Sequence, residues 1–274
     1  MRSALNWWEA IILGLVQGLT EFLPVSSSGH LTLGGALLGL SESHLVFDIA
    51  VHVATLLVVV VYYRSEIAII ARSCLARLGA TSLMAEPGQI QKDVHFFVAM
   101  IIASLPTAVL GLGIKKLGWD DVSTPGFASA MLLVTGGLLF SLRYVGEGGC
   151  STLSYRNAFL IGCIQGCAVL PGISRSGATI ALALWLGIER DEAAKFSFLL
   201  SIPAILGAAL LQILDVLEVG HGVDWSHLLA GGLAAAISGG IAIGLLIPMI
   251  RKGYFTHFCW YVIPVGLMGL LWLS

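Results

Sequence analysis

The feature of this sequence that most limits its fold is a series of long apolar runs with almost no charge. Each run reaches the roughly 18 residues that a helix needs to cross a bilayer. Hydrophobic residues make up 57% of the 274 residues and charged residues 11%, which is too few charges to cover a soluble globule and too much apolar side chain for a disordered chain. The runs also lack the alternation of a membrane β-barrel. We predict an all-α polytopic membrane protein.

Six runs predict complete membrane spans, and two further runs are interrupted. The complete spans are residues 45–63, 95–115, 124–143, 193–217, 227–250 and 254–273. Residues 8–40 are broken at Pro24-Val25-Ser26-Ser27-Ser28-Gly29, and residues 154–188 are broken at Pro171-Gly172-Ile173-Ser174-Arg175-Ser176-Gly177. Each half of a broken run is too short to span a bilayer, so each run predicts a re-entrant helical hairpin. Its tip must be buried in protein or line a wet cavity, because lipid offers the backbone no hydrogen bonds.

The basic residues between the spans predict an orientation. The connection 64–94 and the other loops on its side carry ten of the 14 Lys and Arg residues, and the opposite side carries three, Arg2, Lys115 and Lys116. Because basic loops remain in the cytoplasm, we expect both termini to be periplasmic. The net charge of −2 gives no indication of nucleic-acid binding.

A shift of 148 residues places the first broken run on the second. Gln17 then falls on Gln165, and Ser28 falls on Ser176. Within one membrane domain, each copy holds a hairpin, which returns to the side it entered from, and three spans. Three crossings is an odd number, so the second copy starts from the opposite face and the repeats are inverted. The two repeats are about residues 1–145 and 154–274. Broken helices at matching positions predict a midplane substrate site; the alternative is chance similarity between two turns rich in Gly and Ser.

The second tip contains small and polar residues that favour anion binding: Ser174, Arg175, Ser176, Gly177 and Thr179. A guanidinium at membrane depth is costly unless it is paired, so Arg175 is a candidate functional residue. Hydroxyls and the N-terminal N–H groups of a predicted helix over 178–187 form an anion cradle, to which Arg175 adds a planar fork for phosphate. Thr179 either donates to the anion or caps its helix. Alternatively, Arg175 is a structural partner of Glu21.

The first tip supplies a carboxylate, hydroxyls and an imidazole: Gln17, Glu21, Ser26, Ser27, Ser28 and His30. Glu21 is a candidate ligand for a divalent cation that bridges phosphate oxygens, with Gln17 or Asp48 nearby. Ser27 is a candidate nucleophile, and His30 its base or the acid for the leaving group. Other interpretations stay open. The serines can be helix caps and His30 a packing residue, and Asp48, with His44 and His52 one turn away, can orient the site or lie at an interface.

These motifs resemble those of the undecaprenyl pyrophosphate phosphatase family, also called bacitracin-resistance proteins. The first motif reads Gln17-Gly-Leu-Thr-Glu21-Phe-Leu-Pro-Val-Ser-Ser-Ser-Gly-His30, and the second reads Pro171-Gly-Ile-Ser-Arg175-Ser-Gly-Ala-Thr179. The resemblance covers essentially the whole chain. Two departures concern position 17, which is Gln here, and the third helix, where Asp48 and His52 stand in place of the expected Glu and Gln.

The resemblance implies an inner-membrane phosphatase that converts undecaprenyl pyrophosphate to undecaprenyl phosphate and inorganic phosphate, which recycles the lipid carrier of cell-wall synthesis. It implies a divalent cation, Mg²⁺ or Ca²⁺, and a site open to the periplasm. By matching position, the catalytic residues are Glu21, Ser27, His30 and Arg175, and the substrate-binding residues are Gln17, Ser26, Ser174, Ser176, Gly177 and Thr179. We expect the prenyl tail in an apolar cleft between helices, and a homodimer as the candidate assembly. The alternative function is a polyprenyl-phosphate transporter or flippase, because inverted repeats with broken helices are common in transporters.

Overall fold

A computed structural model of the chain is helical and contains no strand in the part it describes, which is residues 5–40, 45–79, 86–118, 122, 124–146, 149–150, 152–219 and 225–273. The elements are α1 (Trp7–Phe22), α2 (Ser27–Leu37), α3 (Leu45–Tyr62), α4 (Arg64–Arg77), α5 (Pro87–Lys116), α6 (Pro125–Ser141), η1 (Leu142–Tyr144), α7 (Tyr155–Cys167), α8 (Arg175–Trp185), α9 (Arg190–Val219), α10 (Trp225–Arg251), η2 (Tyr254–Phe258) and α11 (Cys259–Trp272). Five of the described helices can cross a membrane, or six spans if the bent pair α3 and α4 counts as one. This confirms the predicted all-α polytopic class.

Both interrupted runs form helical hairpins. α1 begins with a capping box, in which Asn6 and Glu9 satisfy each other's backbone N–H groups, and it ends before Pro24. In the second hairpin, α8 begins at Arg175 and not at the predicted residue 178. Ser174 accepts a hydrogen bond from the Gly177 N–H at 3.0 Å, which moves the helix start toward the tip.

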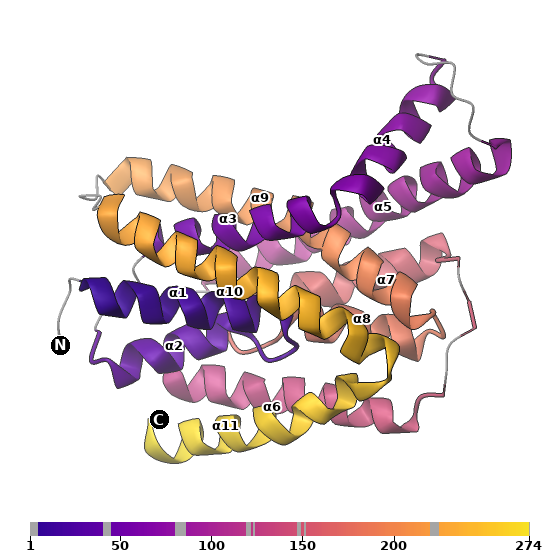
Figure 1. Cartoon of the computed structure of the whole chain (residues 1–274). Coiled ribbons are helices and arrows are strands. Elements are labelled where there is room, and N and C mark those ends of the chain that lie inside the picture. The colour runs from indigo at the N-terminus through magenta and orange to yellow at the C-terminus, as the bar shows by residue number, and fades with distance from the viewer. Residues whose placement is uncertain are drawn as a thin grey trace.

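The outer helix of each hairpin packs closely on a long helix of the other half of the chain (Figure 1). A Cβ atom at Gly14 would overlap the backbone of Gly231, so α1 approaches α10 to backbone contact. At the matching position of the second hairpin, a Cβ atom at Gly162 would overlap the backbone of Ala103, so α7 approaches α5 in the same way. Small residues at helix interfaces permit such close packing in membrane proteins.

The remaining helices pair across the halves as well. α3 packs on α9, and α6 packs on α11, with α2 beside α6 in the same layer (Figure 1). The outer hairpin helices and these two pairs thus make corresponding contacts, whereas the inner hairpin helices differ, because α2 and α8 both pack on α6. The inverted repeat stays a prediction.

The connection 64–94 was expected to be a loop, and that expectation is wrong. It contains α4 and the first turns of α5, which project together beyond the helical body (Figure 1). α4 bends by 70° from α3. It is tied to α5 by Asp93, whose carboxylate accepts from the Ser73 hydroxyl at 2.7 Å and from the Gln89 amide at 2.8 Å. The hydrophobic runs alone did not identify α4 because its charged residues interrupt the apolar pattern.

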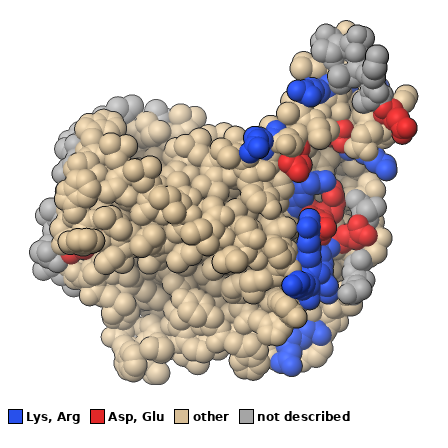
Figure 2. All heavy atoms as spheres, viewed as in Figure 1, with Lys and Arg blue, Asp and Glu red and all other residues tan. Residues whose placement is uncertain are grey.

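Charged side chains on the face shown in Figure 2 gather at the end from which α4 projects, and the rest of that face is almost uncharged. α1 begins and α11 ends at the opposite end of the molecule (Figure 1). An apolar belt with charge at one end is the surface expected of a protein embedded in a bilayer. Which end faces the cytoplasm stays a prediction.

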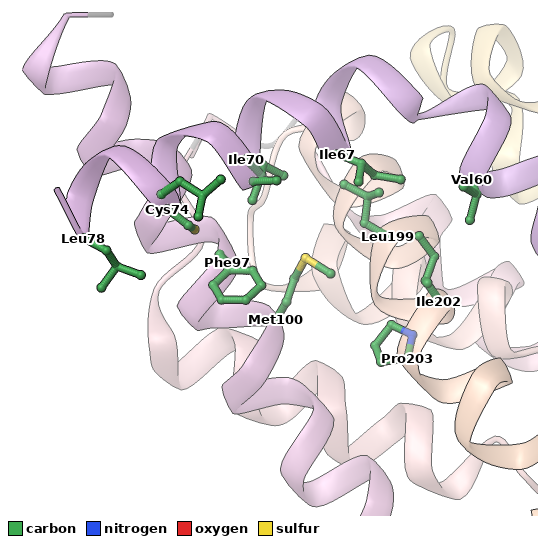
Figure 3. A pocket seen from close by; sticks show the side chains of 12 residues that line it. Val60, Ile67, Ile70, Cys74, Leu78, Phe97, Met100, Leu199, Ile202 and Pro203 are labelled. Carbon is green, nitrogen blue, oxygen red and sulfur yellow. The ribbon is translucent and has the colours of Figure 1, made fainter. Parts of the chain in front are cut away.

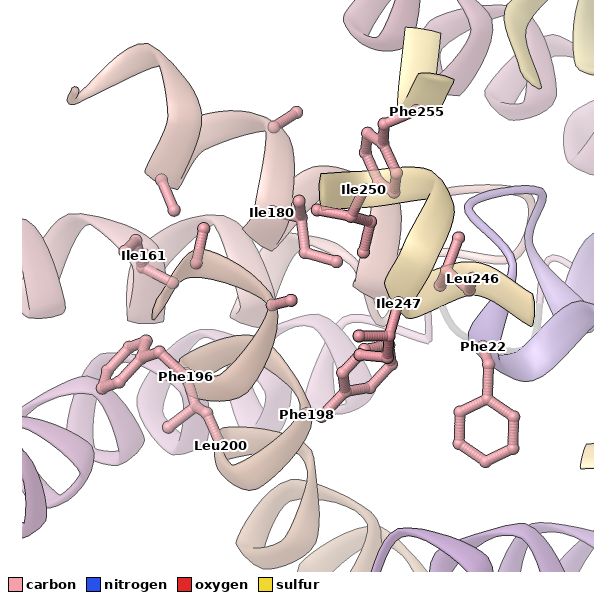
Figure 4. Close-up of a cluster of buried hydrophobic side chains, with 14 of the residues drawn as sticks. Phe22, Ile161, Ile180, Phe196, Phe198, Leu200, Leu246, Ile247, Ile250 and Phe255 are labelled. Atoms are coloured by element: carbon pink, nitrogen blue, oxygen red, sulfur yellow. The ribbon is translucent and has the colours of Figure 1, made fainter. Parts of the chain in front are cut away.

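The core lies between α5, α8, α9 and α10 and holds both hairpins in place. Figure 4 shows Phe196 and Phe198 of α9 pointing to opposite sides, and the ring of Phe198 meets that of Phe22, at the end of α1, in an edge contact with centroids 6.0 Å apart. Ile180 of α8 and Leu246 of α10 are fully buried in the same cluster. The hairpin tips are therefore positioned by close-packed apolar side chains, which resist displacement.

Candidate functional site

Glu21 is the point at which the two hairpin tips meet. Its side chain is 4% exposed, and its Oε1 atom pairs with the guanidinium Nη2 of Arg175 from the second tip. Its Oε2 atom accepts from the Ser27 hydroxyl at 2.5 Å and from the Gln17 amide at 3.0 Å. The structure thus brings together four of the predicted site residues, from segments far apart in the chain. Arg175 also forms the ion pair with Glu21 that the sequence left open as the alternative to a phosphate-binding role.

The backbone of the first tip is held in an unusual conformation at Ser26. Ser26 has φ 68° and ψ 101°, and it is the one non-glycine residue with positive φ in the described part of the chain. Such a conformation typically costs about 1–3 kcal/mol and persists only where its surroundings enforce it. The Ser26 hydroxyl accepts from the Gly29 N–H at 3.2 Å, which starts α2 and directs Ser27 toward Glu21. Ser26 is therefore a cap, while Ser27 is available for chemistry.

His30 lies one turn into α2, and other groups engage both of its ring nitrogens. Nδ1 lies 2.8 Å from the carbonyl oxygen of Ser26, and Nε2 lies 2.9 Å from the hydroxyl of Tyr261 on α11. The imidazole and phenol rings stack, with centroids 5.6 Å apart and planes at 11°. Ser27 has Glu21 as its hydrogen-bond acceptor, so the carboxylate, and not His30, is in place to take the serine proton.

The second tip is a buried turn that presents Arg175. A Cβ atom at Gly172, where φ is 96°, would overlap the carbonyl of Ala128, so only glycine fits there. Thr135 of α6 holds the turn from both sides, because its hydroxyl donates to the Gly172 carbonyl at 2.9 Å and accepts from the Ser174 N–H at 3.0 Å. Ser176 lies 3.3 Å from the Ser174 hydroxyl and donates to the Leu23 carbonyl of the first tip at 3.4 Å. The turn thus fixes the base of the Arg175 side chain.

Thr179 points into the protein and away from the tip. Its hydroxyl donates to the Arg175 carbonyl at 2.8 Å and lies 2.5 Å from the hydroxyl of Ser197 on α9. It is completely buried. Thr179 therefore ties α8 to α9 in this structure, and a contact to a bound anion stays a prediction.

The third helix brings His52 to the site. His52 Nε2 lies 3.8 Å from Glu21 Oε2, and its Nδ1 lies 2.7 Å from the backbone carbonyl of Asp48. The sequence left open whether Asp48 and its neighbouring histidines orient the site or lie at an interface, and the structure places His52 beside the carboxylate. His44 lies outside the described residues.

The sequence of the whole helical body matches one protein family. The model of the family described as "Bacitracin resistance protein BacA" matches residues 10–268. The chain belongs to this family. A relative from Desulfatibacillum aliphaticivorans, named undecaprenyl-diphosphatase, is 42% identical over 267 residues, which cover 94% of this chain and 96% of the relative.

Two further relatives carry the same name. The protein of Desulfosudis oleivorans is 43% identical over 264 residues, covering 94% of this chain and 95% of the relative. The protein of Salinibacter ruber is 38% identical over 271 residues, covering 98% and 100%. The sequence resemblance to the bacitracin-resistance family is thereby confirmed.

A divalent cation, which the resemblance implied, fits the oxygen donors around Glu21. The Oε1 atom of Gln17 is fully buried and has no hydrogen-bond partner among the described residues. An unpaired carbonyl oxygen beside a carboxylate suits a hard cation that takes its other ligands from phosphate and water. Within the described ranges, no group of three or more His, Cys, Asp or Glu residues is placed to enclose a metal. The described residues thus offer Gln17 and Glu21 as candidate oxygen donors, and the divalent cation stays a prediction.

An apolar cavity of about 520 Å³ lies apart from these residues, between α3, α4, α5 and α9. Figure 3 shows Val60, Ile67, Ile70, Phe97 and Ile202 among the side chains that line it. The lining has the apolar character expected of a prenyl-tail cleft. None of the predicted site residues lines this cavity.

Tyr261 and Thr135 were not predicted as site residues. Each lies within a predicted membrane span, where a single Tyr or Thr is common in packing. No spacing in the sequence connects Tyr261 to His30, which is 231 positions away. Only the pairing of helices across the two halves of this BacA-family chain places these side chains at the tips.

Proposed function

We propose that this chain is an undecaprenyl-diphosphatase, which hydrolyses undecaprenyl diphosphate to undecaprenyl phosphate and inorganic phosphate. The family membership and the names of relatives that are 38–43% identical over nearly the full chain support this activity. The observation that carries the proposal is the contact of Arg175 and Ser27 with the same buried carboxylate, Glu21. The relatives' names do not support the alternative of a transporter or flippase.

Arg175 is the phosphate-binding group. Its side chain is 18% exposed and reaches Glu21 from a rigid turn. A guanidinium offers two parallel N–H donors to phosphate, and its charge opposes the negative charge that accumulates in phosphoryl transfer. When the terminal phosphate engages Arg175, the guanidinium no longer neutralises Glu21, which leaves the carboxylate free to accept a proton.

Ser27 is the attacking group in this proposal. Its Oγ forms a bond to the terminal phosphorus while its proton passes to Glu21 Oε2, and the bond from that phosphorus to the bridging oxygen breaks. Undecaprenyl phosphate leaves with the bridging oxygen. A water molecule then attacks the phosphoserine, which releases inorganic phosphate and restores Ser27. Glu21 takes the Ser27 proton and returns it when the bond from Ser27 Oγ to phosphorus breaks, and His30, the other proton acceptor of the first tip, takes the proton that the attacking water loses.

Gln17 and Glu21 are the proposed cation ligands, with Mg²⁺ or Ca²⁺ as the ion. Such a cation neutralises charge on the phosphate oxygens when it is bound. Calorimetric titration with each metal should show binding to the wild type and weaker binding to Gln17→Ala. Equal binding by the two proteins would remove Gln17 from the cation site.

We also propose the bacterial inner membrane as the location, with both termini and the site open to the periplasm and the two halves in inverted orientation. The basic loops and the reciprocal packing of α1 on α10 and α7 on α5 support this arrangement. Single cysteines introduced at Trp7 and Trp272 should react with an impermeant thiol reagent in intact spheroplasts, whereas one at Arg156 should react only after permeabilisation. The homodimer stays a prediction.

The activity is tested by inorganic phosphate release from undecaprenyl diphosphate by the purified protein in detergent, with Mg²⁺ or Ca²⁺ present. Release is expected without any sealed compartment, since hydrolysis needs only one site. Absence of release, combined with movement of the lipid across vesicles that contain the protein, would establish a transporter.

A further inference from the structure

We infer that Tyr261 is the positioning residue for His30 and that the C-terminal helix α11 thereby completes the reaction centre of the first tip. This inference rests on the proposed phosphatase function and deepens it. It concerns how His30 is held in the free enzyme, and so it makes predictions both for catalysis and for the imidazole itself.

The tautomer of His30 follows from the hydrogen-bond inventory of its neighbours. Nδ1 lies 2.8 Å from the carbonyl oxygen of Ser26, and a carbonyl oxygen only accepts, so Nδ1 carries the hydrogen. In a neutral imidazole, Nε2 is then the acceptor. The Tyr261 hydroxyl, 2.9 Å away, is the donor that Nε2 requires. Ser26 and Tyr261 together define which nitrogen of His30 can exchange a proton.

The ring of Tyr261 adds a second constraint. It lies nearly parallel to the imidazole, at 11°, with the centroids 5.6 Å apart. Contact along the ring face and a hydrogen bond at Nε2 together restrict rotation of the His30 side chain. A general acid or base must be held in a narrow range of orientations to be effective, so this constraint bears on catalysis.

Packing alone does not account for the place of Tyr261. Its side chain is 49% exposed, so it is no anchor of the core. It carries the only hydroxyl of α11, and that hydroxyl meets the imidazole of the first tip. On the second tip, Thr135 of α6 plays the corresponding part, and α6 and α11 pack on each other. Thus α6 in the first half supplies a hydroxyl to the second tip, and α11 in the second half supplies a hydroxyl to the first tip.

Because Nδ1 is committed to the Ser26 carbonyl, any proton that His30 gains or donates passes through Nε2, the atom that Tyr261 occupies. Once Nε2 is protonated it no longer accepts, and the Tyr261 hydroxyl must turn its hydrogen away and accept from Nε2 instead. Loss of this hydroxyl should therefore change turnover and leave phosphate binding by Arg175 nearly unchanged.

The test compares Tyr261→Phe, which keeps the ring and removes the hydroxyl, with the wild type in the phosphate-release assay. We expect kcat to fall about tenfold, on the scale of one hydrogen bond, with KM within about twofold. Tyr254→Phe is the matched control, because Tyr254 also lies against a histidine, His257, but in η2 and outside the two tips. It should keep full activity.

A double-mutant cycle separates positioning of His30 from a general structural role. In a His30→Gln background, the change Tyr261→Phe should cost no further activity. An equal loss with and without His30, or a rise in KM alone, would overturn the inference.

The nitrogen signals of His30 give a readout that does not depend on activity. In protein labelled with ¹⁵N-histidine, with the His30 signals identified from the His30→Gln variant, Tyr261→Phe should shift the Nε2 resonance while Tyr254→Phe leaves it in place. An unchanged Nε2 resonance in Tyr261→Phe would overturn the inference. If Tyr261→Phe shifts the Nε2 resonance but the wild-type protein releases no phosphate, the contact between Tyr261 and His30 stands and the phosphatase function is rejected.

Discussion

The two hairpin tips occupy matching positions in the sequence, yet they differ in how they are held. The second tip is largely buried, with Ser174 and Ser176 at 2% and 4% exposure, and Thr135 forms two hydrogen bonds to its backbone. The first tip exposes Ser27 and His30 more, contains the strained Ser26 and is met by the half-exposed Tyr261. The second tip presents a permanent charge, and the more open first tip carries the groups that exchange protons in the proposed reaction.

This difference indicates a division of labour within one site. Binding by Arg175 needs a fixed guanidinium, since a planar fork works only in one orientation. Proton transfer by Glu21 and Ser27 needs access to substrate and water. Variants of the two tips should therefore differ in kind, with losses in kcat from the first tip and losses in substrate affinity from the second.

The largest effect is expected for Glu21→Gln. The amide neither accepts the Ser27 proton effectively nor neutralises Arg175, so kcat should fall by about 10³-fold or more. Phosphate release by the purified variant measures this, with elution as a monodisperse peak as the control for folding. Activity within tenfold of the wild type would remove Glu21 from the proton transfer.

Ser27→Ala tests whether the first tip supplies the nucleophile. We expect a loss of about 10²- to 10³-fold in kcat, and loss of a phosphoserine that rapid acid quench traps in the wild type. Ser28→Ala is the comparison, since the Ser28 hydroxyl accepts from the Gly172 N–H at 3.4 Å and does not contact Glu21 in the described structure. Retained turnover in Ser27→Ala would assign the attack to water.

Arg175→Lys tests the second tip. An ammonium cannot reproduce the planar fork, so we expect kcat/KM to fall about 10²-fold, with a large part of the loss in KM. Arg251→Lys is the matched control, because Arg251 pairs with Asp191 at 2.7 Å while both side chains are 61% exposed. A loss confined to kcat would contradict the proposed division between the tips.

The smallest effect is expected for Thr135→Val, which keeps the shape of the side chain. Removing the hydroxyl leaves the Gly172 carbonyl and the Ser174 N–H unpaired, at a cost of about 1–3 kcal/mol each for a buried group. The thermal unfolding midpoint should fall, and KM should rise about tenfold as the turn loosens. Thr20→Val, whose hydroxyl bonds only the Val16 carbonyl of its own helix among the contacts described, should change KM little.

The positions of the two tips were predictable from sequence. Pro24 and Pro171, with the glycines and serines that follow them, interrupt apolar runs that otherwise continue as helices, so the hairpins follow from local backbone chemistry. A guanidinium inside such a run requires a partner, and Glu21 was an available carboxylate. The family motifs predicted the same residues, and the structure brings Glu21, Ser27 and Arg175 into contact.

The residues that orient these groups could not be predicted in this way. Tyr261 and Thr135 lie inside apolar helices, and the spacing of hydrophobic residues in such a helix does not reveal which neighbour the helix packs against. α4 was missed for a related reason, since its mixed charge resembles a loop until Asp93 ties it to α5.

The sequence by itself therefore determined the membrane class, the two broken helices and the candidate reactive groups, because these depend on hydrophobicity, on local backbone preference and on the motifs at the breaks. Only the tertiary structure decided that Glu21 contacts residues of both tips and that the Tyr261 hydroxyl is hydrogen-bonded to His30 Nε2. Those contacts depend on which helices pack against each other, and the helices concerned are more than 150 residues apart in the sequence.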